Sequence, residues 1–110
     1  MEGRASPQAG LQAIADLDRT VHSPARLMIL AVLYVSEEAD FAFLLDSSGL
    51  TRGNLSSHMA RLEEEGYVTV RKEFVARRPL TVYQITRQGR RAFSAYRQQI
   101  MSALASLPEE

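Results

Sequence analysis

The stretch that decides the fold is Leu50–Gly66, which reads Leu-Thr-Arg-Gly-Asn-Leu-Ser-Ser-His-Met-Ala-Arg-Leu-Glu-Glu-Glu-Gly. Thr51 is suited to begin a helix because its hydroxyl can accept a backbone N–H of the first turn. Gly66 is suited to follow the helix because glycine readily adopts the left-handed conformation found at helix ends. Between them, one apolar stripe recurs at helical spacing, formed by Leu55, Met59 and Leu62. The stretch predicts a helix over about 51–65.

The face opposite that stripe is free of acids, and its side chains are small or polar. Its members are Gly53, Asn54, Ser56, Ser57, Ala60 and Arg61. The carboxylates are confined to the last turn, at Glu63–Glu65. Such a face can lie close to a polyanion, as a helix in the major groove of DNA must. The alternative is an ordinary solvated face, although that usually carries long charged side chains throughout.

Toward the N-terminus, two more helices are expected. Leu11–Val21 places four apolar residues on one helical stripe, namely Leu11, Ile14, Leu17 and Val21. Ser23 and Pro24 then fit the N-cap and first position of a second helix, because proline lacks an N–H that would be unpaired there anyway. This second helix, from Ala25 to about Val35, is apolar nearly all round and should lie at the centre of the core.

The segment that leads into the decisive stretch predicts a helix-turn-helix. Ser36–Asp40 is an acidic loop with a very short strand around Ala39. A short helix should follow from Phe41 to about Ser47, and Gly49 should make the turn into the helix that begins after Thr51. A short helix, a glycine-containing turn and a capped helix have the spacing of that motif.

After Gly66 the pattern changes from helical to strand-like. Tyr67–Val70 and Leu80–Ile85 are rich in strand formers, and the intervening Arg71–Pro79 predicts a hairpin with a basic tip. Pro79 suits the edge of a hairpin because it has no N–H to donate. Thr86 should cap a last helix over about 87–107, whose apolar seam consists of Phe93, Tyr96, Ile100, Ala103 and Leu107.

Length and composition are those of one ordinary globular domain. The chain has 110 residues, of which 45% are hydrophobic and 24% are charged. The longest apolar run, Leu27–Val35, is too short to cross a bilayer. Residues 1–10 lack the apolar core of a secretory signal and are expected to be disordered. We therefore expect a cytoplasmic protein with a folded domain over 11–110.

The sequence gives no support for an enzyme, a metal site or a cofactor. There is no cysteine, and His22 and His58 are the only histidines, so neither a thiolate site nor a histidine cluster is expected. No nucleophile–base pair, phosphate-binding glycine loop or carboxylate dyad is present. Four aromatic side chains are interpreted as core or hairpin-base residues rather than as a ligand cage: Tyr34, Phe41, Phe43 and Phe74.

The charges are distributed unevenly although the net charge is zero. Between Tyr67 and Arg91 there are seven basic residues against Glu73 alone. By contrast, Ser36–Leu50 carries four acidic residues and no basic one. A basic hairpin beside an acid-free helix face is typical of a surface that binds phosphates. The alternative is a solvated hairpin with scattered arginines.

Four stretches together resemble the MarR/ArsR-type winged helix-turn-helix transcriptional regulators, and with Phe41–Leu44 they resemble most the compact single-domain branch. They are His22–Leu30, Leu50–Met59, Leu62–Val68 and Tyr83–Arg90. Each motif is short, but their order and spacing cover roughly residues 18–97. The resemblance implies an α+β, mainly helical fold: a winged helix-turn-helix domain with a recognition helix at about 51–65, a wing at about 67–85 and a long C-terminal dimerisation helix.

The resemblance also implies a function and its residues. The expected function is sequence-specific binding of double-stranded DNA by a homodimeric regulator, usually a repressor, at an inverted-repeat operator. The expected DNA contacts lie on the recognition helix and the wing: Arg52, Asn54, Ser56, Ser57, Arg61, Arg71, Lys72, Arg77 and Arg78. Relatives often have glycine before the paired wing arginines and a basic residue after the proline, where this chain has Ala76 and Leu80. The wing is therefore expected to be stiffer and less charged at its tip.

The apolar stripes of the first and last helices are expected to join across a two-fold axis. The residues assigned to this dimer interface are Leu11, Ile14, Leu17, Phe93, Tyr96, Ile100, Leu104 and Leu107. The alternative is that these two helices pack on each other within one chain. A second function class also stays open, a winged-helix module that binds protein instead of DNA. The sequence does not identify a small-molecule effector.

Overall fold

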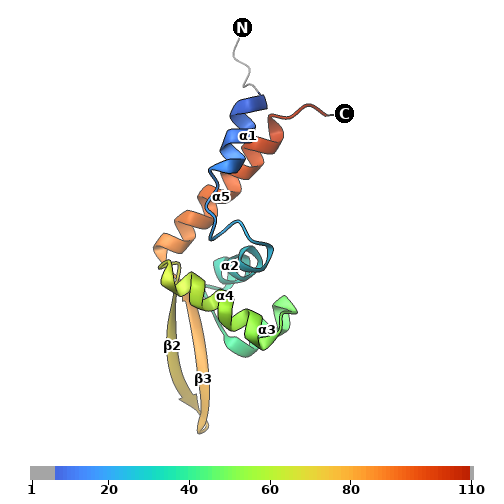
Figure 1. The fold of residues 1–110 in the computed structure, drawn as a ribbon. Coiled ribbons are helices and arrows are strands. Elements are labelled where there is room, and N and C mark those ends of the chain that lie inside the picture. Colours follow the sequence, from blue (N-terminus) through green and yellow to red (C-terminus); the bar gives the residue numbers. More distant parts are fainter. Residues whose placement is uncertain (1–6, 110) are drawn as a thin grey trace.

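The computed structural model describes residues 7–109, which form five helices and three strands (Figure 1). In chain order these are α1 (Pro7–Ala15), α2 (Pro24–Ser36), β1 (Glu38–Asp40), α3 (Phe41–Ser48), α4 (Arg52–Glu64), β2 (Val68–Val75), β3 (Arg78–Ile85) and α5 (Arg87–Ala105). The fold is α+β and mainly helical, as expected. The predicted helix-turn-helix corresponds to α3 and α4, and the predicted hairpin to β2 and β3.

The molecule is elongated, with principal extents of 66 × 26 × 21 Å. Figure 1 shows three parts along its length. At one end α1 lies along the C-terminal half of α5, and we call this pair the stalk. In the middle α2, α3 and α4 form a compact body, and at the other end the β2–β3 hairpin projects away from it.

Side-chain caps set the starts of four helices. Ser23, Thr51 and Thr86 accept the backbone N–H of Arg26, Asn54 and Gly89 at the starts of α2, α4 and α5. These three caps confirm the sequence predictions. Asp40 also caps α3 by accepting the N–H of Phe43, at 2.8 Å, which the sequence analysis did not anticipate. Such caps satisfy donors that the first turn of a helix leaves without a partner.

The N-terminal helix differs from the prediction of Leu11–Val21. α1 begins at Pro7 and ends at Ala15, and the chain then turns. The side chain of Asp18 accepts the backbone N–H groups of Thr20 and Val21, so local side-chain bonds replace the helical ladder. The predicted disorder of residues 1–10 is wrong for residues 7–10, which are helical; residues 1–6 lie outside the described part of the chain.

The three strands form an antiparallel sheet in the order β1-β3-β2. β1 pairs only with the inner end of β3, at Val82–Gln84, so the outer half of the hairpin is two-stranded. Pro79 lies in that outer half opposite Phe74, on a strand whose other edge has no neighbour there. The position agrees with the expected edge role of a proline.

The core lies where α2 meets the other elements. Ile29, Leu30 and Leu33 of α2 are fully buried, together with the predicted stripe of α4. α2 packs on α3, α4, α5 and β3, which confirms it as the central helix. Two aromatic assignments are wrong: Phe43 and Phe74 are exposed rather than part of the core or the hairpin base. Phe74 lies on the outer half of the hairpin, beyond the helices that could cover it.

Candidate nucleic-acid interface

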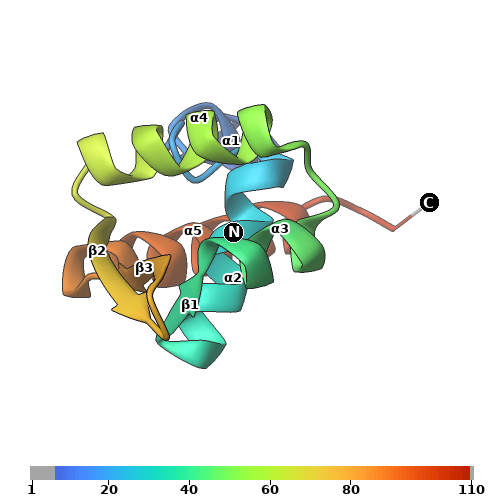
Figure 2. The same ribbon diagram turned by 90° about the horizontal axis from the view of Figure 1, so that it is seen from below.

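α4 presents the acid-free face to solvent. Every residue assigned to that face is exposed, namely Gly53, Asn54, Ser56, Ser57, Ala60 and Arg61, and so is Arg52 before it. The helix runs along one edge of the body (Figure 2), with its apolar stripe packed inward and the opposite face turned outward. A Cβ built on Gly53 would have no heavy atom within 4 Å. The fold itself therefore does not require a glycine there, and the first turn of α4 is open to a close approach by a ligand.

The C-terminal half of α4 is joined to the segment between α1 and α2 by side-chain hydrogen bonds. Arg61 donates from Nη2 to Thr20 Oγ1 at 3.2 Å, and Thr20 donates to Glu65 at 3.1 Å. Arg26 donates to the carbonyl of Thr20 at 2.6 Å and lies 3.0 Å from His58 Nδ1. Arg61 is thus held toward this segment and away from the middle of the acid-free face.

Two titratable groups in this region have shifted pKa values. Burial and the neighbouring Arg26 lower the pKa of His58, so the imidazole stays neutral to lower pH than usual. Burial, the hydrogen bond to Asp18 and the charge of that carboxylate raise the pKa of Tyr67. His58 is therefore a half-buried, uncharged partner of Arg26 at neutral pH.

Arg52, at the start of α4, stacks over the ring of Phe41 with 5.4 Å between the guanidinium carbon and the ring centroid. The two side chains line a depression of about 250 Å³ together with Pro79, Leu80 and Thr81 of β3. The Arg52 side chain therefore lies where the start of α4 meets α3 and the hairpin. Spacing in the sequence did not indicate it, because the partner belongs to the preceding helix.

The basic residues of the hairpin fall into two groups. Arg71, near the middle of β2, pairs with Glu38 at 2.8 Å and also with Glu73. The other three, Lys72, Arg77 and Arg78, are exposed, and the part of the chain that the structure describes gives them no ion pair. The positive charge available to a ligand is therefore concentrated toward the tip.

The tip is a two-residue turn made by Ala76 and Arg77, with φ angles of 52° and 68°. Turns of this length need left-handed conformations, for which glycine or asparagine is usual. A Cβ at both positions restricts the turn, in line with the stiffness expected for the wing. In Figure 1 the hairpin projects beyond the body to which α4 belongs, and the link between them is Arg52, at the start of α4, which lines one depression with Pro79 and Leu80.

The residues assigned to dimerisation have three different environments. Leu17 and Tyr96 are buried within the chain, and the Tyr96 hydroxyl lies 2.8 Å from His22 Nδ1. Half-buried positions are Ile14, Phe93 and Ile100. Exposed positions are Leu11, Leu104 and Leu107, together with Met101, which was not among the predicted interface residues. α1 packs on α5 within the chain, and an apolar surface still remains on the stalk.

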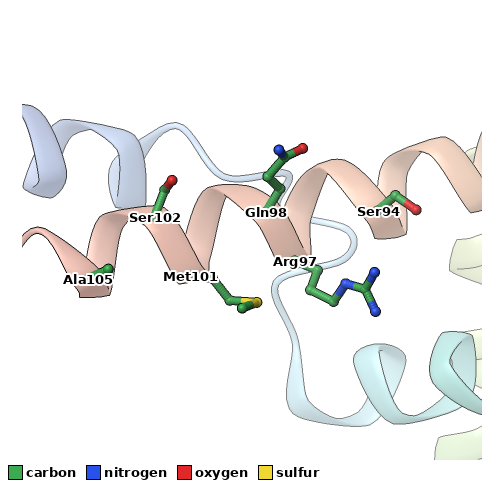
Figure 3. A pocket seen from close by; sticks show the side chains of 6 residues that line it. All are labelled: Ser94, Arg97, Gln98, Met101, Ser102 and Ala105. Atoms are coloured by element: carbon green, nitrogen blue, oxygen red, sulfur yellow. The ribbon is translucent and has the colours of Figure 1, made fainter.

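That surface continues into an open groove of about 730 Å³ along α5. In Figure 3, Met101 and Arg97 point from α5 toward the space beside the body, whereas Gln98 and Ser102 point to the other side of the helix. We refer to the exposed apolar residues Leu11, Met101, Leu104 and Leu107 as the stalk face. An apolar area of this kind on a small protein typically marks a contact surface.

Residues 25–105 match the family model of the winged helix DNA-binding domain. The chain belongs to this family. Within this winged helix DNA-binding domain, α3 and α4 form the helix-turn-helix and β2 and β3 form the hairpin that follows it.

Individual relatives agree with this assignment. An uncharacterized protein of Methanocaldococcus jannaschii is 40% identical over 80 residues, which are 73% of this chain and 87% of the relative. The solved structure of a transcriptional regulator homologue from Pyrococcus horikoshii OT3 is 30% identical, with a TM-score of 0.83 over 92% of this chain and 99% of that one. A MarR-family regulator from Silicibacter pomeroyi shares the fold at 18% identity, with a TM-score of 0.61 over 88% and 64% of the two chains.

Among residues 7–109, no three histidine, cysteine, aspartate or glutamate side chains are grouped so that they could hold a metal ion. None of the helices described has the length and apolar composition needed to span a bilayer.

Proposed function

We propose that this winged helix protein is a homodimeric transcriptional repressor that binds an inverted-repeat site in double-stranded DNA. The observation that carries the proposal is the exposed, acid-free face of α4, whose first residue Arg52 lines a depression together with Pro79 and Leu80 of the basic wing. α4 would enter the major groove, where side chains reach base edges, and the wing tip would approach the adjacent backbone and minor groove. A dimer that occupies promoter DNA blocks polymerase without any further contact, so repression is the simplest regulatory outcome.

The contacts differ in what they contribute. Asn54, Ser56 and Ser57 lie on the open part of the α4 face, and we assign base reading to them. Arg61 already donates to Thr20 and Arg71 is paired with two carboxylates, so both should contribute less. We assign phosphate or minor-groove contacts to the available cations of the wing, Lys72, Arg77 and Arg78.

The homodimer would form through the stalk face. A single recognition helix reads only a few base pairs, and mismatch penalties at so few positions give little discrimination in a genome. Two copies joined at their stalks would place two α4 helices in successive major grooves, ~34–36 Å apart. The exposed Leu11, Met101, Leu104 and Leu107 provide the apolar area that such a contact needs.

The function is tested by selecting preferred sites from a random duplex pool with the purified protein and then measuring affinity for the selected site. Asn54→Ala should weaken binding by ~1–3 kcal/mol and relax preference at one position per half-site, because one base-edge contact is lost. Ser36→Ala, at an exposed polar position at the end of α2, is the matched control and should bind as the unchanged protein does. Selection of no consensus would refute sequence-specific recognition.

The wing is tested by the salt dependence of binding. The double variant Arg77→Ala/Arg78→Ala should weaken binding to all sequences and flatten the plot of log affinity against log salt by about one unit per lost phosphate contact. Arg71→Ala is the matched control, and its slope should change less because Arg71 is already ion-paired. Binding without any salt dependence in the unchanged protein would favour the alternative of a protein-binding winged helix.

A further inference from the structure

Phe74 on the wing has no role in the fold. Its side chain is 77% exposed, although phenylalanine is usually buried. Its cross-strand partner is Pro79, which is also exposed, and side chains of directly paired residues lie on the same face of a hairpin. The two residues therefore form an apolar ridge on the outer half of the wing.

The ridge continues the inner face of the sheet. The inner pairs on that face, Val68 with Ile85 and Val70 with Tyr83, are buried or half-buried against the body. Further out the same face carries the pair Lys72–Thr81 and then the ridge. The ridge is thus a second apolar area on this face, separated from the covered inner pairs by the polar pair Lys72–Thr81.

The surroundings of the ridge are basic. Lys72 lies two residues before Phe74, and Arg77 and Arg78 follow at the tip. The nearby carboxylate, Glu73, is paired with Arg71. An apolar surface bordered by exposed cations is complementary to a ligand in which anionic groups flank an apolar group. The walls of the minor groove have this composition, because phosphates lie beside deoxyribose rings.

We propose that Phe74 and Pro79 pack on deoxyribose rings of the minor groove next to the major groove that α4 enters. The inference rests on the proposed function, because it assigns a DNA contact to the wing. Packing on sugars fits better than insertion between bases, since a wedge needs to lead the approach and Phe74 lies behind the Ala76–Arg77 turn. The ridge would then contribute affinity without neutralising a phosphate.

The salt dependence of binding distinguishes the contribution of the ridge from that of the neighbouring arginines. Counterion release makes the salt slope count phosphate contacts, and an apolar contact adds nothing to it. Loss of Phe74 should therefore shift the plot of log affinity against log salt downward without a change of slope. Loss of Arg77 and Arg78 should change the slope itself.

The experiment compares Phe74→Ala and Phe74→Leu with the unchanged protein, using the selected duplex over a salt series. Phe74→Ala should bind about tenfold more weakly with the same slope, and Phe74→Leu should lose about two- to threefold, because an apolar side chain remains. Val35→Ala is the matched control: Val35 is 84% exposed at the end of α2, outside the wing, and its loss should leave affinity unchanged. Because Phe74 is exposed, the variants should keep the circular dichroism spectrum and thermal midpoint of the unchanged protein.

Hydroxyl-radical footprinting provides the second readout, because the radical attacks deoxyribose. Protection of the minor-groove sugars beside each half-site should be weaker with Phe74→Ala and retained with Val35→Ala. Unchanged affinity and an unchanged footprint for Phe74→Ala, with site-specific binding intact, would overturn this inference alone. If Phe74→Ala were a monomer while the unchanged protein is a dimer, the ridge would belong to the contact between the two copies, and this result would also overturn the inference. Failure of the unchanged protein to select any site would refute the proposed function.

Discussion

The variant Leu104→Glu is expected to be a monomer that binds the inverted-repeat duplex at least ~100-fold more weakly than the unchanged protein. Leu104 is 54% exposed on α5, in the middle of the stalk face that we assign to the dimer. A carboxylate there would have to lose its water in the interface without a partner, which opposes association. In a monomer the two recognition helices are no longer linked. Binding of one helix to its half-site then no longer raises the effective concentration of a second helix at the other half-site, and most of the affinity is lost.

The measurement is light scattering at micromolar concentration, followed by titration of the whole site and of an isolated half-site. The unchanged protein should have twice the chain mass of 12.3 kDa, and Leu104→Glu should have that mass itself. Gln99→Glu adds the same charge to another exposed position of α5 and is the control; it should stay dimeric. An unchanged protein that scatters as a single chain, or prefers the isolated half-site, would contradict the proposed assembly.

The largest loss of stability is expected for Gly89→Ala, by roughly 2–4 kcal/mol in the free energy of unfolding. Gly89 is buried in the first turn of α5, and a Cβ built there would overlap the carbonyl oxygen of Tyr67 and crowd Ile85. Because the carbonyl belongs to the backbone, it cannot move aside as a flexible side chain would. The cap formed by Thr86, which accepts the N–H of Gly89 and donates to the carbonyl of Gly66, lies in the same turn and would be disturbed as well.

Gly53→Ala is the matched control, since it makes the same change in the first turn of another helix. Space around Gly53 is open, so the better helix propensity of alanine should leave stability equal or higher by up to about 1 kcal/mol. Urea unfolding followed by circular dichroism measures both variants. Equal stabilities of Gly89→Ala and the unchanged protein would show that α5 can move away from Tyr67.

Local signals in the sequence predicted the helices of the body closely. Ser23, Thr51 and Thr86 each precede a helix and cap it, and Gly49 and Gly66 adopt the left-handed conformations that end α3 and follow α4. These features depend on a few neighbouring residues, so they can be read without knowledge of the tertiary structure. The apolar period of α4 likewise identified its buried side.

The N-terminal region could not be predicted in the same way. Leu11, Ile14, Leu17 and Val21 have helical spacing, but only the first two lie on α1. Leu17 and Val21 are buried from a turn that the side chain of Asp18 holds in place. Periodicity does not distinguish a helical stripe from apolar residues that reach the core from an irregular segment.

The candidate site shows the same limit. The sequence identified the α4 face and the basic wing, and it could not show which arginines have partners. Arg61 bonds to Thr20 and Arg71 pairs with Glu38, both far away along the chain. Nor could strand alternation show that Phe74 lies beyond the body, because that depends on where the helices stop covering the sheet.

The stalk and the projecting wing also determine how the protein moves through solution. Its radius of gyration is 17.0 Å, whereas a compact chain of this length has about 13 Å. A rod-like particle experiences more friction than a sphere of equal mass, so a single chain should leave a gel-filtration column early and sediment slowly. Judged by elution volume alone, a monomer could be mistaken for a larger species. Only a method that weighs the particle independently of its shape separates one copy from two.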